Sequence, residues 1–417
     1  MILSIIKGSF GILLFKVIGA VCLLLTNVIV ANSLGIGAVG ELAYLVSLLM
    51  LSSLFGRLGL DIYVLKIASY SSRYEISLLV FTSILVAGLS SIIFSAIYYA
   101  FDDVLLIKMT SHRVVLPLLF FINTLYSILP ECIRGMGFPF EYAFLRNFII
   151  NFVVFTLSSV VIYSGYDFDV VLIYAVANVV ALVMFLSIYR RKDGYFVAKL
   201  IPLRTLPSLL KESMLMSVGA IFVYLISGFG PLLLSIFYSK EQIGTYSIVL
   251  QLTLVFTLVA TSSAGYVSPF LAKTNREGKI DEFRKYYIGC VVISLCILIP
   301  IFFIYLLFGK LILSEIFTIS DPDAYRMLMV ISLSLLIGSC VGPKFNALNM
   351  TDNANTLTKI ISFFGMSGFI VSFFVAKEWG VYFYAVSTSI ISVTISVVAA
   401  FMVNKKFSII RRGDLPA

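Results

Sequence analysis

Charged side chains are scarce in this sequence: Asp, Glu, Lys and Arg together make up 12% of the residues, whereas hydrophobic residues make up 60%. A water-soluble protein with so few charges would lack the polar side chains that cover a hydrated surface. Apolar runs of about 20 residues, the length that crosses a bilayer, recur along the whole chain. The composition therefore excludes a soluble enzyme or binding domain and predicts an all-α polytopic membrane protein.

Residues that form disulfides or bind metals are also few. The five cysteines are an odd number, none forms a C-x-x-C pair, and His112 is the only histidine. We therefore expect no disulfide framework and no metal site. The cysteines are interpreted as small core residues of the apolar runs.

Twelve membrane spans are predicted, and most of the links between them are short, so neighbouring helices must run antiparallel. The predicted spans lie near residues 10–32, 41–56, 77–99, 114–130, 142–164, 169–189, 213–236, 245–267, 287–309, 326–348, 357–376 and 380–403.

A basic linker that contains Pro202 and Pro207 divides these spans into two sets of six. Because six is an even number, both sets begin on the same side of the membrane, and an internal repeat must be parallel. The predicted domains are an N-terminal six-helix lobe at 1–192, a cytoplasmic linker at 193–212, a C-terminal six-helix lobe at 213–404 and a cytoplasmic tail at 405–417.

A weak internal repeat supports this division. At an offset of 204 residues, VGELAYLVS aligns with IGTYSIVLQ, and Gly40 aligns with Gly244. At an offset of 213 residues, Glu131 aligns with Lys344. Two similar helical halves are the typical organisation of a membrane transporter.

The positive charges indicate the orientation. With the N-terminus inside, the inner side receives 23 of the 30 Lys and Arg residues and the outer side receives six. Basic residues accumulate on the cytoplasmic side of membrane proteins, so both termini are predicted to be cytoplasmic. The net charge of +9 is thus interpreted as a topology signal and not as a sign of nucleic-acid binding.

Residues 33–69 form the most distinctive stretch. Glycines stand at both ends of its apolar run, and the run ends in RLGLD, with Arg57 and Asp61 four residues apart. On a helix these two side chains share a face, so we expect them to pair at the membrane edge.

The LG…G-E…RLGLD pattern over the first two spans resembles the polysaccharide-transport branch of the multidrug/oligosaccharidyl-lipid/polysaccharide exporter superfamily, and most of all its Wzx-type O-antigen flippases; the IRG-M-G segment after span four fits less closely. The resemblance implies a V-shaped pair of lobes in the bacterial inner membrane that opens alternately inward and outward. The implied substrate is undecaprenyl pyrophosphate carrying one oligosaccharide repeat unit. The implied function is transport, so we expect no enzyme activity and no catalytic residue. Membrane lipid, a polysaccharide polymerase and a chain-length regulator are the implied partners, and no nucleic acid is expected.

Such a substrate needs particular side chains, because unpaired charge and hydroxyl groups are costly to bury in hydrocarbon. Lys and Arg bind phosphates, and amides bind sugar hydroxyls. Spans one and eight, which carry the amide candidates, line the central cavity in the resembled family. The alternatives are charges that set topology and amides that join helices. The substrate-binding candidates are Lys16, Arg57, Arg146, Lys344, Asn27 and Gln251.

Acidic residues discriminate between the related transporters. A multidrug or cation antiporter would be expected to carry a buried carboxylate in an N-lobe helix, but span one has none, and Glu41 and Asp61 stand only at the ends of span two. These two are the candidates for proton or sodium coupling, and no other cofactor is expected. A lipid II flippase would be expected to have helices beyond twelve, and an O-antigen polymerase a large outer loop. Export of another lipid-linked glycan, such as capsule or exopolysaccharide, stays open.

The orientation is testable with reporter fusions. A reporter that is active only in the cytoplasm should work when it is fused after Lys199 or Arg412 and should be silent when it is fused within 102–111. Silence at either of the first two positions would contradict the predicted orientation, because it would place a strongly basic segment outside.

Overall fold

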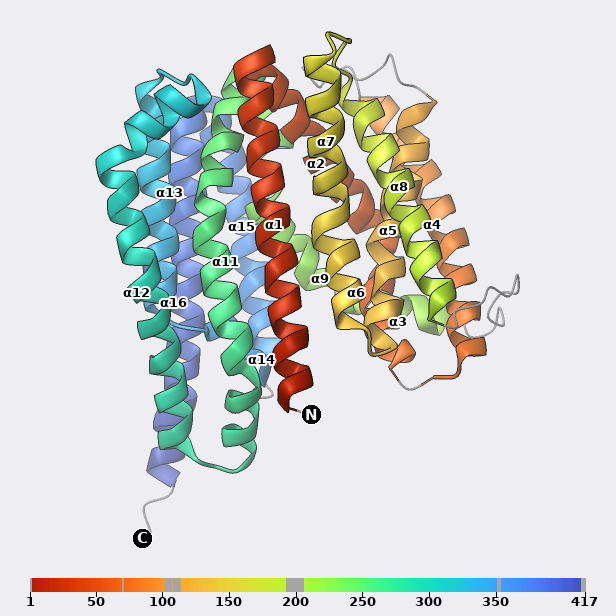
Figure 1. Ribbon diagram of the computed structural model, residues 1–417. Helices are drawn as coiled ribbons and strands as arrows, with labels where there is room; N and C mark the ends of the chain where they lie inside the picture. Colours follow the sequence, from red (N-terminus) through yellow and green to blue (C-terminus); the bar gives the residue numbers. More distant parts are fainter. Residues whose placement is uncertain are drawn as a thin grey trace. The chain divides into compact units, whose positions relative to one another are not determined.

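The computed structural model describes residues 2–69, 71–101, 107, 114–192, 206–350 and 354–413. All regular secondary structure in these residues is helical (Figure 1). Eleven of the described helical segments are long and apolar enough to cross a membrane. The predicted fold, an all-α polytopic membrane protein, is therefore confirmed.

The first half of the chain provides six predicted spans, and its helices keep close to the predicted ranges. They are α1 (Ile2–Leu34), α2 (Ile36–Arg57), α3 (Leu60–Ala68), α4 (Arg73–Phe101), α5 (Val115–Gly135), α6 (Pro139–Ala143), the π-helix η3 (Phe144–Ile149), α7 (Ile150–Tyr163) and α8 (Val170–Arg191). Helices α6, η3 and α7 follow one another without a gap and together form one span.

The second half contains two interrupted spans where the sequence predicts continuous ones, at 213–236 and 326–348. Its helices are α9 (Leu206–Ser227), α10 (Gly230–Leu234), α11 (Lys240–Arg276), α12 (Ile280–Leu311), the π-helix η4 (Ile312–Ile316), α13 (Pro322–Cys340), α14 (Lys344–Met350), α15 (Ala354–Trp379) and α16 (Val381–Gly413). Pro343 lies between α13 and α14, where its ring and its missing N–H are incompatible with a continuous helix.

The chain forms two compact units. Unit 1 consists of Met1–Ile221 and Tyr238–Gly244, and unit 2 consists of Phe222–Phe237 and Thr245–Ala417. Most of the predicted linker at 193–212 lies outside the described residues. The predicted lobe boundaries therefore stay a prediction.

Unit 1 is built around α5. This helix packs against α2, α3, α4 and α8, and 14 of its 21 residues are buried. Helix α4, in contrast, has an exposed apolar face, on which Leu89, Ile92 and Ile93 are each more than 60% exposed. A row of exposed aliphatic side chains on a helix of spanning length indicates a surface that faces lipid.

The first turns of α2 and α11 cross at very short distance within unit 1. A Cβ atom on Gly40 would lie 2.0 Å from the Lys240 carbonyl oxygen, and one on Gly244 would lie 2.1 Å from the Ile36 carbonyl oxygen. The two contacts are reciprocal. Gly244 lies 204 residues after Gly40, and Lys240 lies 204 residues after Ile36. Residues at equivalent positions of the predicted repeat thus contact each other reciprocally within unit 1.

This crossing predicts a contrast between two glycines of α11. Gly244→Ala should destabilise the protein by about 1–3 kcal/mol, because its methyl group overlaps a backbone oxygen that cannot move freely. Gly265→Ala is the matched control: no atom lies within 4 Å of its added Cβ, so the variant should be neutral or stabilised by up to about 1 kcal/mol. Thermal unfolding of both variants in detergent tests this, and equal unfolding temperatures would refute the close crossing.

Candidate functional site

The chain breaks direction between α2 and α3, directly after the RLG motif. Leu58 and Gly59 both have positive φ angles, 46° and 77°, so α2 ends at Arg57 and a new helix begins at Leu60. Left-handed backbone is costly for a residue with a Cβ, and Gly59 removes that cost for the second position. The α2–α3 break thus brings the C-terminal residue of one helix next to the first turn of the other.

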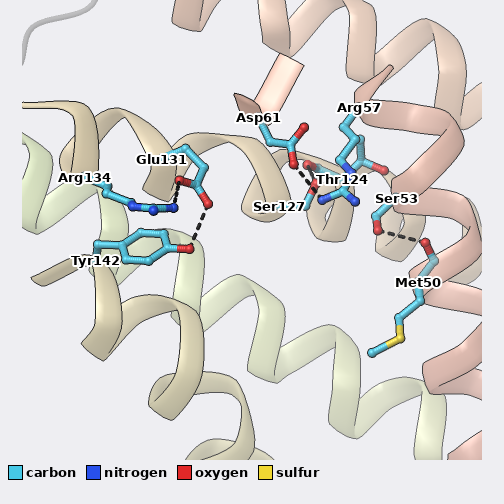
Figure 2. A network of polar contacts seen from close by, with 9 residues as sticks. All are labelled: Met50, Ser53, Arg57, Asp61, Thr124, Ser127, Glu131, Arg134 and Tyr142. Carbon is cyan, nitrogen blue, oxygen red and sulfur yellow. Dashed lines mark hydrogen bonds and ion pairs between the residues drawn. The ribbon is translucent and has the colours of Figure 1, made fainter. Parts of the chain in front are cut away.

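Arg57 and Asp61 form an ion pair across this break. Their Nη1 and Oδ2 atoms are 2.8 Å apart, and each side chain is only 15% exposed (Figure 2). The pairing that the sequence predicts is present, but the single helix assumed for it is not. Asp61 lies in the first turn of α3, where the helix dipole also favours a negative charge.

A second buried carboxylate, Glu131 on α5, belongs to the same end of unit 1. It is 9% exposed and accepts a hydrogen bond of 2.8 Å from the Tyr142 hydroxyl group and one of 3.3 Å from Arg134 (Figure 2). The Arg134 guanidinium also lies over the Tyr142 ring, 5.2 Å from its centre. Arg134 is therefore held in the last turn of α5 by two partners, Glu131 and Tyr142.

Arg146 lies near this group without a carboxylate of its own. Its charge repels that of Arg57, whereas Asp61 and Glu131 attract Arg57. Arg146 is exposed, and within the described part of the chain it forms no ion pair. The basic residues Arg57, Arg134 and Arg146 therefore outnumber the two carboxylates by one.

Arg146 is carried by the π-helix η3 rather than by a regular helix. A π-helical turn inside an α-helix leaves backbone groups less well paired and is frequent at functional sites. The neighbouring residue, Asn147, bonds the Ala143 carbonyl, and its own carbonyl accepts from Asn151. The wider turn thus gives this span an irregular section at the residue that carries the charge.

Helix α1 packs directly on η3 and brings Lys16 to this section. A Cβ on Gly19 would lie 1.9 Å from the Asn147 carbonyl oxygen, so the two backbones touch. Phe15 contacts the rings of Phe144 and Phe148, with ring centres 5.3 and 5.8 Å apart. Lys16 stands between these two contact points along α1 and is half-buried, with no ion pair among the described residues.

The other N-terminal candidates are placed less distinctively. Asn27 is buried in α1. Glu41, at the start of α2, forms an ion pair with Lys240. Both carboxylates that the sequence suggests for ion coupling, Glu41 and Asp61, therefore have a basic partner within unit 1.

In unit 2, Lys344 occupies the first position of α14 and is 8% exposed. Its ammonium group donates to the Gly338 carbonyl oxygen and lies over the Phe345 ring. Lys344 lines a cavity of about 220 Å³. Gln251, the remaining candidate, is buried in α11 and is not among the residues that line this cavity.

The sequence reasoning did not select Glu131 or Tyr142. One signal was available: Glu131 directly follows the predicted span at 114–130, and an ionisable residue at the end of an apolar span is often functional or paired. The partnership with Tyr142 is not visible in the sequence, because it depends on the turn between α5 and α6 and not on helical spacing.

Several solved structures of membrane transporters have this fold. An inward-closed lipid II flippase MurJ has a TM-score of 0.75 and 15% identity, covering 97% of this chain and 90% of that one. An inward-facing multidrug resistance MATE family transporter of the MOP superfamily has a TM-score of 0.71 and 12% identity, covering 95% and 96%. A MOP superfamily transporter from Pyrococcus furiosus, described as having a binding pocket of reverse polarity, has a TM-score of 0.63 and 13% identity, covering 97% and 96%.

These similarities establish the exporter fold that MurJ and MATE proteins share. Residues 5–275 match the family described as polysaccharide biosynthesis protein. Because this match spans well over half of the sequence, the chain belongs to that family. No curated protein matches it significantly.

Because the Arg57–Asp61 ion pair is mostly buried, breaking it should cost more stability than breaking an exposed ion pair. Asp61→Asn leaves the shielded guanidinium without a counter-charge and should destabilise the protein by about 1–3 kcal/mol. Asp323→Asn breaks an ion pair of similar length, between Asp323 and Arg326, whose two side chains are 46% and 63% exposed. This variant should lose about 0.5 kcal/mol of stability or less. Thermal unfolding in detergent compares the two, and an unfolding temperature unchanged by Asp61→Asn would contradict a structural role for the pair.

Proposed function

We propose that this protein is a flippase for lipid-linked oligosaccharide, and that it moves an undecaprenyl-pyrophosphate-linked repeat unit of O-antigen type from the inner to the outer leaflet. The family, the exporter fold and the name of one structural neighbour, a lipid II flippase, support this class of function. The observation that carries the proposal is the excess of positive charge where α1, α2, α5 and η3 meet. An anionic head group is the kind of substrate that such an excess favours.

In this proposal, Lys16 and Arg146 meet the pyrophosphate because neither has a carboxylate partner among the described residues. Arg57 adds to the positive electrostatic potential at this place, and its ion pair with Asp61 fixes the position of its side chain. Asn27 and Gln251 offer amides to sugar hydroxyls, and Lys344 adds a second positive site in unit 2. The lipid tail stays in the bilayer while the head crosses by alternating access, so that no unpaired charge enters hydrocarbon.

The protein would act in the bacterial inner membrane with both termini in the cytoplasm. Membrane lipid, a polymerase and a chain-length regulator are the partners that this role implies. Asp61 and Glu41 remain the candidates for proton or sodium coupling. The second candidate function is a multidrug or cation antiporter, because MATE proteins share the fold.

Cells that lack the protein should accumulate undecaprenyl-linked repeat units on the inner leaflet and lose the finished surface polysaccharide. The reason is that the downstream steps need the lipid-linked unit on the outer leaflet. Lipid extraction with mass spectrometry, together with surface staining, measures both effects. Normal polysaccharide combined with altered drug sensitivity would favour the antiporter instead.

Complementation of these cells tests the basic residues. Lys16→Arg should restore much of the polysaccharide, whereas Lys16→Ala and Arg146→Ala should restore little at unchanged protein abundance, because charge matters more than shape. Lys377→Gln is the control: it removes one positive charge from an exposed residue of α15 and should complement fully. Full complementation by both Lys16→Ala and Arg146→Ala would rule out a role in phosphate binding.

A further inference from the structure

The wall of the cavity in unit 2 is mostly apolar, with a set of polar groups and a single charge set into it. Its volume of about 220 Å³ corresponds to roughly seven water molecules of about 30 Å³ each, enough for one sugar ring. The wall carries six Ser and Thr hydroxyl groups from α11, α13 and α16, the Asn346 amide and the Lys344 ammonium group. None of the described residues that line it is acidic.

The Lys344 ammonium group has unused donors. An ammonium group carries three hydrogens, and only one of them has an acceptor among the described residues, the Gly338 carbonyl oxygen. No described carboxylate lies within ion-pair distance of Lys344, although the residue is more than nine-tenths buried. A buried charge in a membrane protein requires a partner, and the Phe345 ring below the ammonium group is a weaker one than an anion. The two hydrogens without a hydrogen-bond acceptor therefore call for an anionic acceptor inside the cavity.

Most hydroxyl groups around the cavity are acceptors. Thr257 and Thr261 donate to the Leu254 and Thr257 carbonyl oxygens over 2.8 and 2.7 Å. Ser334 and Ser339 likewise donate to carbonyl oxygens of their own helix, over 2.8 and 2.9 Å. Since each hydroxyl has one hydrogen, these four groups can only accept hydrogen bonds from a ligand.

This pattern discriminates between ligands. A bare inorganic anion would find one cationic donor but four oxygen atoms that present lone pairs to it. A cation would be repelled by Lys344. A polyol that carries a carboxylate satisfies both parts of the wall, because its acid group accepts from the ammonium and its hydroxyls donate to the Ser and Thr oxygens. Phe256 and Ala260 offer apolar surface to the carbon face of a ring.

We propose that this cavity is a subsite for one acidic sugar residue, a hexuronate, with its carboxylate on Lys344. The proposal rests on the proposed function, since it assigns the substrate glycan a carboxylate-bearing sugar. Gly338 is part of this site: a Cβ there would contact both the Lys344 Nζ atom and the Ser396 Oγ atom, at 3.7 and 3.5 Å. A larger side chain at this position would occupy the space of the ligand.

Binding of free sugars to the purified full-length protein in detergent tests the subsite. Saturation-transfer NMR titrations with D-glucuronate, D-glucose and acetate should show glucuronate binding at least about tenfold more tightly than either of the others, as expected for a charge-assisted contact. Lys344→Gln keeps a donor for the Gly338 carbonyl and should weaken glucuronate binding about tenfold or more. Lys359→Gln, the same change at an exposed lysine of α15, should leave it unchanged.

Gly338→Val provides a second variant should Lys344→Gln fail to fold, and it should also abolish glucuronate binding. Acetate binding as tightly as glucuronate would overturn the proposal in favour of a small-anion site, and absence of glucuronate binding to the wild-type protein would overturn it outright. Either result leaves the flippase proposal standing if cells lacking the protein accumulate the lipid-linked glycan. Conversely, glucuronate binding without such accumulation would support the subsite and contradict the flippase.

Discussion

A charged side chain within a bilayer needs either a partner or a polar space, and this requirement explains how unit 1 is arranged. Arg57 and Asp61 satisfy each other across the break between α2 and α3. Glu131 is satisfied by Tyr142 and Arg134, which come from the two sides of the next tight turn. The Arg57–Asp61 and Glu131–Tyr142 contacts therefore both depend on a change of chain direction at the end of a span, and the glycine-rich motif makes the first of these changes.

The basic residues without such partners lie at irregular sections of the helices. Arg146 is on the π-helix η3, Lys16 lies on the part of α1 that packs against η3, and Lys344 follows the interruption between α13 and α14. Irregular backbone is tolerated inside a membrane only where protein or a polar cavity surrounds it. The coincidence of irregular helix and unneutralised charge is the reason we propose these three residues, Lys16, Arg146 and Lys344, for contact with the substrate.

The sequence was sufficient for the class of fold because hydrophobic length and charge asymmetry act locally along the chain. It also identified Gly40 and Gly244 as equivalent positions, and the structure adds that they cross each other. It did not predict the break after Arg57, the π-helix at Arg146 or the interruption before Lys344. The break after Arg57 and the interruption before Lys344 have local causes, the left-handed turn at Leu58 and Gly59 and the proline at position 343. The π-helix at Arg146 lies where the α1 backbone touches Asn147, which is far away in the sequence. Hydrophobic periodicity reveals neither kind of cause. The Glu131–Tyr142 contact was missed for the same reason.

The most direct test of the account is movement of the lipid itself in a reconstituted system. Purified protein would be inserted into vesicles that contain a fluorescent undecaprenyl-pyrophosphate oligosaccharide, and a membrane-impermeant enzyme that cleaves the glycan would report how much of it reaches the outer leaflet. The account predicts that the accessible fraction rises with time only in vesicles that contain the protein, and that a fluorescent phospholipid without the glycan head does not move. An accessible fraction equal to that of protein-free vesicles, combined with uptake of a cationic dye, would contradict it.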